Sequence, residues 1–146
     1  QCLIGIKTHT ALSLIVETSD FTRFTKGNVF AAYLGLIPGE DSSGEKENRL
    51  SITKAGNRHL RKLVVESAQG YTRGQIGFKS KDLKARQSKC SNEVIAYADR
   101  CNERLRRKYY RMIARGKSYN VAKVAVAREL ACFVWGIMTD RMELSK

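Results

Sequence analysis

The chain has a single proline, Pro38, and no stretch in which β-branched and polar residues alternate over the length of a strand. Apolar residues instead recur three and four positions apart, which is the spacing of helices that bury one face. We therefore predict a mostly α fold, a compact helical domain of about five helices. A length of 146 residues suits one domain over 1–146 with a single core.

The helical spacing occurs in five segments, which cover about 8–17, 26–34, 54–69, 92–114 and 119–138. In the first segment we expect Thr8 to be the N-cap and Leu12, Ile15 and Val16 to face the core, and in the second we expect Val29 to face inward. The last segment is apolar on most sides and is predicted to be the central core helix.

Two segments lack this spacing. The segment at about 36–52 holds Pro38, two glycines and two adjacent serines, and we predict one long irregular loop there. Long loops in compact domains are more often functional than idle. The segment 70–90 combines three glycines with a lysine-rich run and is predicted to be a mobile basic connector.

Positive charge is concentrated in the later part of the chain. Lys and Arg number 27 against 14 Asp and Glu, a net charge of +13. Residues 1–40 are neutral, whereas residues 41–90 carry +7 and residues 91–146 carry +6. Such a surplus predicts a polyanionic partner, and it assigns the anion-facing surface to the part after residue 40.

Membrane and secreted classes do not fit the sequence. The longest apolar run, Leu130–Met138, is far shorter than the roughly 20 residues that span a bilayer, and no basic segment followed by an apolar one opens the chain. The four cysteines have no C-x-x-C spacing, which favours reduced thiols over zinc ligands or disulfides. We therefore expect a cytoplasmic protein and, because the sequence opens on Gln1, a piece of a longer chain.

Four arginines in the fourth predicted helix lie on one face. Their spacing of 4, 3 and 4 makes a stripe about 16 Å long, formed by Arg100, Arg104, Arg107 and Arg111. Guanidinium groups in such a row can follow a phosphate backbone without reading its sequence. We expect this row to be widened by Arg106, Lys108 and Arg115. A solvated helix face is the alternative, since that is the usual fate of a charge run.

The first forty residues carry a weaker indication. Residues 3–11 resemble the turn of a helix-hairpin-helix motif, in which main-chain amides at a helix N-terminus hold a phosphate. Lys7 stands where the second glycine of that motif would be, so a simple helix start is an equally good reading.

The turn Ser42-Ser43-Gly44 could supply a nucleophile. A serine hydroxyl attacks a phosphodiester only if its proton is removed and cations stabilise the charge that develops on the phosphate. The nearby cations are Lys46, Arg49, Lys54, Arg58 and Arg61. By this chemistry alone, a serine-rich turn is mostly just a turn.

A family resemblance makes the serine more specific. The run from Phe30 to Glu66, in which the serine loop is followed by Lys-x-Gly-Asn-x-x-Leu-Arg, resembles the C-terminal transposase domain of the insertion-sequence 110/116/902 family, to which the Piv and MooV invertases belong. The flanking stretches Thr10–Phe24 and Val124–Leu130 agree with it.

The resemblance implies an RNA-guided recombinase. Members of the family have an N-terminal RNase-H-like domain with four metal-binding acids, a coiled coil, and a helical domain with a nucleophilic serine. The RNase-H-like domain is absent from this chain, so Mg²⁺ is implied there and no cofactor or metal is expected here. The implied partners are DNA, a structured RNA encoded by the element, and further copies of the full-length protein. We expect the isolated chain to bind nucleic acid without completing recombination.

Matched position by position, the nucleophile falls on Ser43, directly before Gly44. Other positions that the family pattern favours are Lys46, Lys54, Gly56, Asn57 and Arg61. The two lysines are expected to clamp phosphate, Gly56 and Asn57 to shape the next helix start, and Arg61 to pair with a phosphate or with the loop. Two positions depart from the pattern. Glu45 replaces a usual glycine, and His59 stands where the family often has another aromatic or polar residue. His59 could serve as a base for Ser43, but a histidine at such a position is more often a surface or packing residue.

We predict four parts within the single domain. Residues 1–36 form a neutral helical part, and residues 37–69 form the serine loop with the helix that follows it. Residues 70–90 form the basic connector, and residues 91–146 form the basic helix and the core helix. Two other functions stay open. One is a non-catalytic basic helical module that only binds nucleic acid, and the other is a domain used mainly for protomer assembly.

Overall fold

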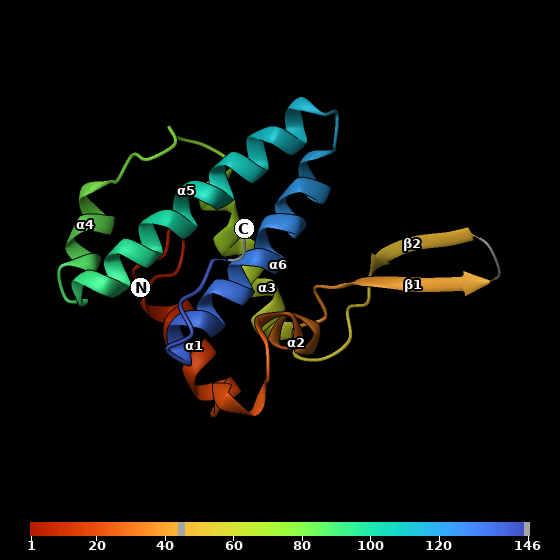
Figure 1. Cartoon of the computed structure of the whole chain (residues 1–146), viewed down its shortest axis with the longest axis horizontal. Coiled ribbons are helices and arrows are strands. Elements are labelled where there is room, and N and C mark those ends of the chain that lie inside the picture. Colours follow the sequence, from red (N-terminus) through yellow and green to blue (C-terminus); the bar gives the residue numbers. More distant parts are fainter. Residues whose placement is uncertain (44–45, 145–146) are drawn as a thin grey trace.

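The computed structural model describes residues 1–43 and 46–144, and over residues 39–43 and 46–51 it describes the main chain alone (Figure 1). Its elements are α1 (Thr8–Thr18), η1 (Phe21–Arg23), α2 (Gly27–Tyr33), β1 (Pro38–Ser43), β2 (Lys46–Ile52), α3 (Arg58–Ala68), η2 (Gln69–Tyr71), α4 (Lys81–Gln87), α5 (Asn92–Ala114) and α6 (Tyr119–Met138). The prediction of a mostly α fold is confirmed, with six α-helices in the described residues instead of about five.

Helix α6 is the central helix, as predicted, and it contacts α2, α3 and α5. Val126 and Leu130 are fully buried, and the indole Nε1 of Trp135 donates hydrogen bonds to the carbonyls of Phe21 (3.2 Å) and Phe24 (3.1 Å). These bonds satisfy a buried polar group and tie the chain before α2 to the core. None of the helices in the described residues is long and apolar enough to cross a bilayer.

The buried face of α1 differs from the prediction. Leu14 and Thr18 are buried, while Leu12, Ile15 and Val16 are exposed. Apolar residues fill most positions from 11 to 16, so the spacing does not select a face, and tertiary contacts select it instead. On α2, Val29 is also predicted to face the core and is exposed instead.

The predicted cap of α1 is also wrong. The capping position is taken by Lys7, which makes no side-chain bond to the helix, and the hydroxyl of Thr8 donates to Gln1 Oε1 at 3.3 Å instead. The Thr8 hydroxyl is thus hydrogen-bonded to the N-terminal residue and does not cap the helix.

The expected irregular loop at 36–52 is a β-hairpin. Strands β1 and β2 pair antiparallel from Pro38 opposite Ile52 to Ser43 opposite Lys46, with an irregular register between Pro38 and Glu40. The hairpin projects away from the helices (Figure 1). Its residues are mostly polar, so no apolar alternation signals a strand, and main-chain hydrogen bonds define it.

The expected connector at 70–90 contains helix α4, which the prediction missed. Ser80 caps the helix, because its Oγ accepts a hydrogen bond from the amide of Leu83 at 3.1 Å, and Leu83 itself is buried. A helix of seven residues with one buried leucine gives too short a periodic pattern to detect.

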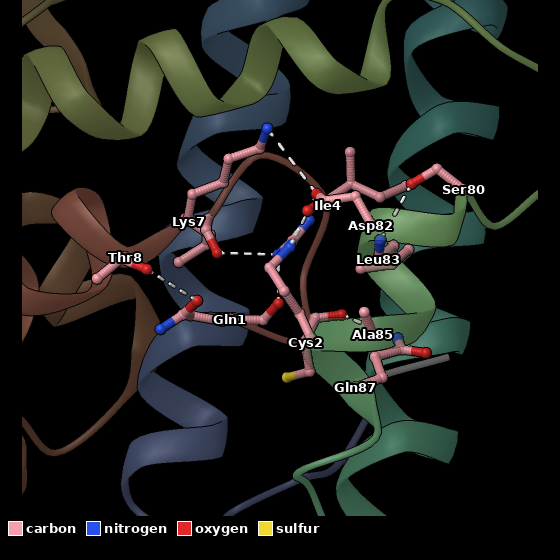
Figure 2. A network of polar contacts seen from close by, with 12 residues as sticks. Gln1, Cys2, Ile4, Lys7, Thr8, Ser80, Asp82, Leu83, Ala85 and Gln87 are labelled. Atoms are coloured by element: carbon pink, nitrogen blue, oxygen red, sulfur yellow. Dashed lines mark hydrogen bonds and ion pairs between the residues drawn. The ribbon is translucent and has the colours of Figure 1, made fainter.

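Figure 2 shows that α4 holds the N-terminal segment. The amide of Gln87 donates to the carbonyl of Cys2 at 3.0 Å. The Arg86 guanidinium donates to the carbonyls of Leu3 (3.2 Å) and Ile6 (3.0 Å) and bonds the carbonyl of Gln1 as well. Residues 80–90 are therefore part of the folded domain and not a linker.

Candidate nucleic-acid interface and serine hairpin

Two glycines fix the base of the hairpin. Gly56 has φ +82°, and a Cβ there would lie 1.8 Å from the carbonyl oxygen of Tyr33. Gly35 has φ +71°, and a Cβ there would lie 2.1 Å from the carbonyl oxygen of Ala55. Only glycine fits such close approaches at positive φ, so the two ends of the hairpin are held directly against each other.

Hydrogen bonds reinforce this base. The amide of Lys54 donates to Gly35 O at 3.2 Å. Arg61 on α3 is half-buried, and its Nη1 donates to Leu34 O at 3.4 Å and to Ala55 O at 3.3 Å. One guanidinium thus bridges the segment that enters the hairpin and the segment that leaves it.

Asn57 begins helix α3 as its N-cap. Its Oδ1 accepts a hydrogen bond from the amide of Leu60 at 2.9 Å, and its Nδ2 donates to Glu17 Oε1 at 3.3 Å. The other oxygen of Glu17 lies 2.6 Å from Nδ1 of His59. His59 is therefore engaged with α1 at the base of the hairpin.

Ser43 is the last residue of β1, opposite Lys46. It lies five residues beyond Pro38, about 17 Å along an extended strand, so its main chain is at the far end of the hairpin, away from the helical core (Figure 1). Gly44 and Glu45, and the side chains of Ser43, Lys46 and Arg49, lie outside what the structure describes. Nearer the base, Lys54 and Arg58 are exposed.

The predicted arginines of α5 do share one face. With Lys108 they border a groove of about 630 Å³, lined by Arg100, Glu103, Arg104, Arg107, Lys108, Arg111 and Glu129. Five cations against two carboxylates leave this groove with a charge of +3. An open groove with that charge can hold a phosphate backbone.

Two carboxylates order these cations. The side chain of Glu129 is only 13% exposed, and it accepts hydrogen bonds from Arg104 Nε at 2.5 Å and Lys108 Nζ at 2.7 Å. Glu103 accepts a bond from Arg107 at 2.6 Å. Glu129 comes from α6, so it fixes part of the basic face of α5 to the neighbouring helix.

Arg106 does not widen the stripe, contrary to the prediction. At 3.6 residues per turn it points about 200° away from Arg104. It is buried, and its Nη1 donates to the carbonyls of Gln75 (2.8 Å) and Phe78 (3.0 Å).

Arg128 of α6 lies between the basic groove and the base of the hairpin. A second hollow of about 360 Å³ shares Arg104, Lys108 and Glu129 with the groove and adds Arg128 of α6. Arg128 also borders a third, apolar hollow of about 390 Å³, whose lining includes residues of the hairpin base and of α6. Sequence reasoning missed Arg128 because it lies on the mostly apolar core helix.

The thiols carry no metal-site geometry. Within residues 1–43 and 46–144, no three His, Cys, Asp or Glu side chains cluster as metal ligands. The four cysteines are free, and burial raises the pKa of Cys101 to about 12 and that of Cys132 to about 11. Both thiols are therefore protonated at neutral pH and serve as packing groups.

Residues 2–81, more than half of the chain and including the hairpin, α3 and the segment after it, match the family model described as Transposase IS116/IS110/IS902 family. The chain belongs to this transposase family. The sequence-based resemblance is thereby confirmed.

Several curated relatives of this family member are similar along nearly its whole length. The putative transposase y4qE of Sinorhizobium fredii is 39% identical over 96% of this chain and 35% of its own length. The transposase for insertion sequence element IS1111A of Coxiella burnetii is 29% identical over 95% of this chain and 32% of its own. The chain thus spans about a third of the length of these relatives. No solved structure matches the chain significantly.

Proposed function

We propose that this family member is the serine-bearing domain of a DNA transposase or site-specific recombinase, in which Ser43 attacks the DNA backbone. One observation carries the proposal: Arg128 of α6 borders both a hollow that joins the basic groove of α5 and the hollow beside the base of the hairpin whose first strand ends at Ser43. DNA lying along that groove would have the hairpin at one end of its track.

The reaction would be a phosphoryl transfer. The hydroxyl of Ser43 gives up its proton as Oγ forms a bond to phosphorus, the bond from phosphorus to the strand oxygen breaks, and that oxygen takes up a proton as the strand leaves. The ester on Ser43 conserves the energy of the broken linkage, so a second strand end can be joined by the reverse step. Cations next to the phosphate would stabilise the charge that develops on it.

The positive groove of α5 would hold the duplex. Arg100 and Arg111 are exposed at its two ends, and the cations between them are ordered by Glu103 and Glu129. Contacts to phosphates fix the position of DNA without selecting a sequence. In the same proposal, an RNA encoded by the element chooses the target, the full-length protein acts as a homo-oligomer, and acids of another domain hold Mg²⁺.

The decisive experiment traps the ester. A longer protein that includes the remaining domains, incubated with element-end DNA, should yield a covalent protein–DNA adduct that mass spectrometry maps to residue 43. Ser43→Ala should abolish the adduct with unchanged DNA affinity, and the matched control Ser42→Ala should retain it. An adduct that persists in Ser43→Ala would refute the proposal.

A non-catalytic DNA-binding module is the second candidate, favoured by the groove charge of +3. It predicts recombination that is unaffected by Ser43→Ala. Both candidates predict that affinity falls with salt, with a slope of about −4 to −5 in a double-logarithmic plot if about five phosphates are neutralised.

A further inference from the structure

The segment from Gly74 to Phe78 is a pinned loop on the side of α5 away from the basic groove. It is part of the yellow-green trace that leads from the end of α3 to α4 (Figure 1). The hydroxyl of Tyr110 donates to Gly74 O at 2.7 Å, and Arg106 donates to the carbonyls of Gln75 and Phe78. The amide of Phe78 closes a turn onto Gln75 O at 3.2 Å. Two side chains of α5 therefore fix the shape of this loop.

Arg106 is buried where it holds this loop. Arg106 is 8% exposed, and its Nε has no hydrogen-bond partner in the described part of the chain. Its Nη1 donates hydrogen bonds to main-chain carbonyls. A buried cation without a carboxylate is unfavourable unless its other contacts compensate. Gly74, at φ +89°, fits closely against it, since a Cβ there would lie 2.9 Å from Nη2. Arg106 and Gly74 thus hold the loop in one defined shape.

The pinned loop presents apolar side chains to solvent. Phe78 is 59% exposed and Ile76 is 39% exposed, and Tyr110, which bonds the same loop, is 36% exposed. The Phe78 side chain also borders a small hollow of about 110 Å³. An apolar patch on a loop that two side chains of α5 hold in place is a candidate binding surface.

The chain on either side of this ring is basic. The segment 70–90 has six basic residues and one acidic residue, a net charge of +5. Lys79 is paired with Asp99 at 2.6 Å, and Arg86 bonds the N-terminal segment. The other four cations of the segment are exposed, namely Arg73, Lys81, Lys84 and Lys89. An aromatic ring among exposed cations complements a strand that offers both a base face and phosphates.

We propose that this surface binds single-stranded DNA, with one unpaired base stacked on the ring of Phe78 and the adjacent phosphates held by the exposed cations. A duplex does not offer this contact, because its base faces are already stacked on each other. A protein partner with an apolar patch would not need the net charge of +5. The choice of DNA rests on the proposed function, since strand exchange exposes unpaired stretches of DNA. The surface itself is distinct from the groove on the opposite side of α5.

The test uses the 146-residue chain and a 12-nucleotide single-stranded DNA that carries the fluorescent base 2-aminopurine. Phe78→Ala should weaken binding roughly tenfold and abolish the quenching of 2-aminopurine, because stacking on one ring contributes about 1–3 kcal/mol per base. Phe78→Trp should retain both signals. Affinity for a duplex of the same sequence should change less than twofold in each variant.

Phe78→Leu separates stacking from simple apolar contact. It keeps an apolar side chain without a π face, so it should lose single-strand affinity as Phe78→Ala does. Wild-type affinity in Phe78→Leu or in Phe78→Ala would overturn the inference. Equal melting temperatures of the variants control for folding. Ser43→Ala should leave single-strand binding unchanged, so a failed stacking surface and a failed nucleophile give different results.

Discussion

Replacing Gly56 with alanine tests whether main-chain contact at the hairpin base holds the hairpin in place. An L-residue in a left-handed conformation costs about 1–2 kcal/mol relative to glycine. The new Cβ would lie 1.8 Å from Tyr33 O, against 3.4–4 Å for ordinary contact, so the two segments must separate. That separation also breaks the bond from the amide of Asn57 to Tyr33 O, 3.3 Å long, which contributes about 1 kcal/mol. We expect Gly56→Ala to lower the free energy of unfolding by about 3 kcal/mol.

Gly116 supplies the matched control. It follows α5 at φ +83° and has nothing within 4 Å of the place a Cβ would occupy. Gly116→Ala therefore carries the conformational cost alone, about 1 kcal/mol. Urea denaturation followed by circular dichroism measures both variants. In a chain of this size the melting temperatures should fall by about 10 °C for Gly56→Ala and about 3 °C for the control.

The comparison isolates the contact from the backbone conformation. Equal losses in the two variants would mean that the hairpin base can open at no cost, which would refute the reasoning. In the longer protein, Gly56→Ala should also reduce formation of the covalent adduct without lowering DNA affinity, because the α5 groove does not depend on the hairpin.

Two further predictions concern charge. Glu129→Gln removes the carboxylate that pairs with Arg104 and Lys108. In a filter-binding assay, duplex DNA should therefore bind the variant severalfold more tightly and with a steeper salt dependence. Weaker binding would contradict the assignment of the groove as the DNA-binding surface. The pKa values of Cys101 and Cys132 are raised by burial above the ordinary 9.0, to about 12 and about 11. Below pH 9 both thiols are protonated in the folded and unfolded chains, whereas above it the unfolded chain ionises first. Above pH 9 the free energy of unfolding should therefore fall with rising pH, by up to about 1.4 kcal/mol for each pH unit and each thiol. In Cys101→Ala the fall per pH unit should be smaller.

The two long helices could be predicted from the sequence because local signals agree there. Ser91 and Ser118 each accept a hydrogen bond from an amide in the first turn of α5 or α6, and Gly116 separates the two helices. Apolar spacing over more than five turns then leaves one choice of buried face for α5, while α6 is apolar on most sides and so is predicted to be central. At these positions, capping, turn chemistry and periodicity point to one structure.

The misses occur where tertiary contacts decide. The first helix is apolar on several sides, and its tertiary contacts determine that Leu14 is buried and Val16 exposed. The hairpin has no apolar face to reveal it. Arg106 looks like another member of a basic stripe until the loop that covers it is known, because its role depends on carbonyls about 30 residues earlier in the chain.

The candidate site combines a predictable part with an unpredictable one. Spacing places the arginines of α5 on a common face, but it does not relate that face to the serine. The relation depends on Arg128, which borders both a basic hollow and the apolar hollow next to the hairpin base, and on Arg61, which bonds the carbonyls of Leu34 and Ala55. A polar hairpin cannot be held by apolar burial along its length, so its direction must be set at its base. Close glycine contacts and one bridging guanidinium supply that constraint, and this is why residues far from the tip would govern where a reactive serine meets the DNA.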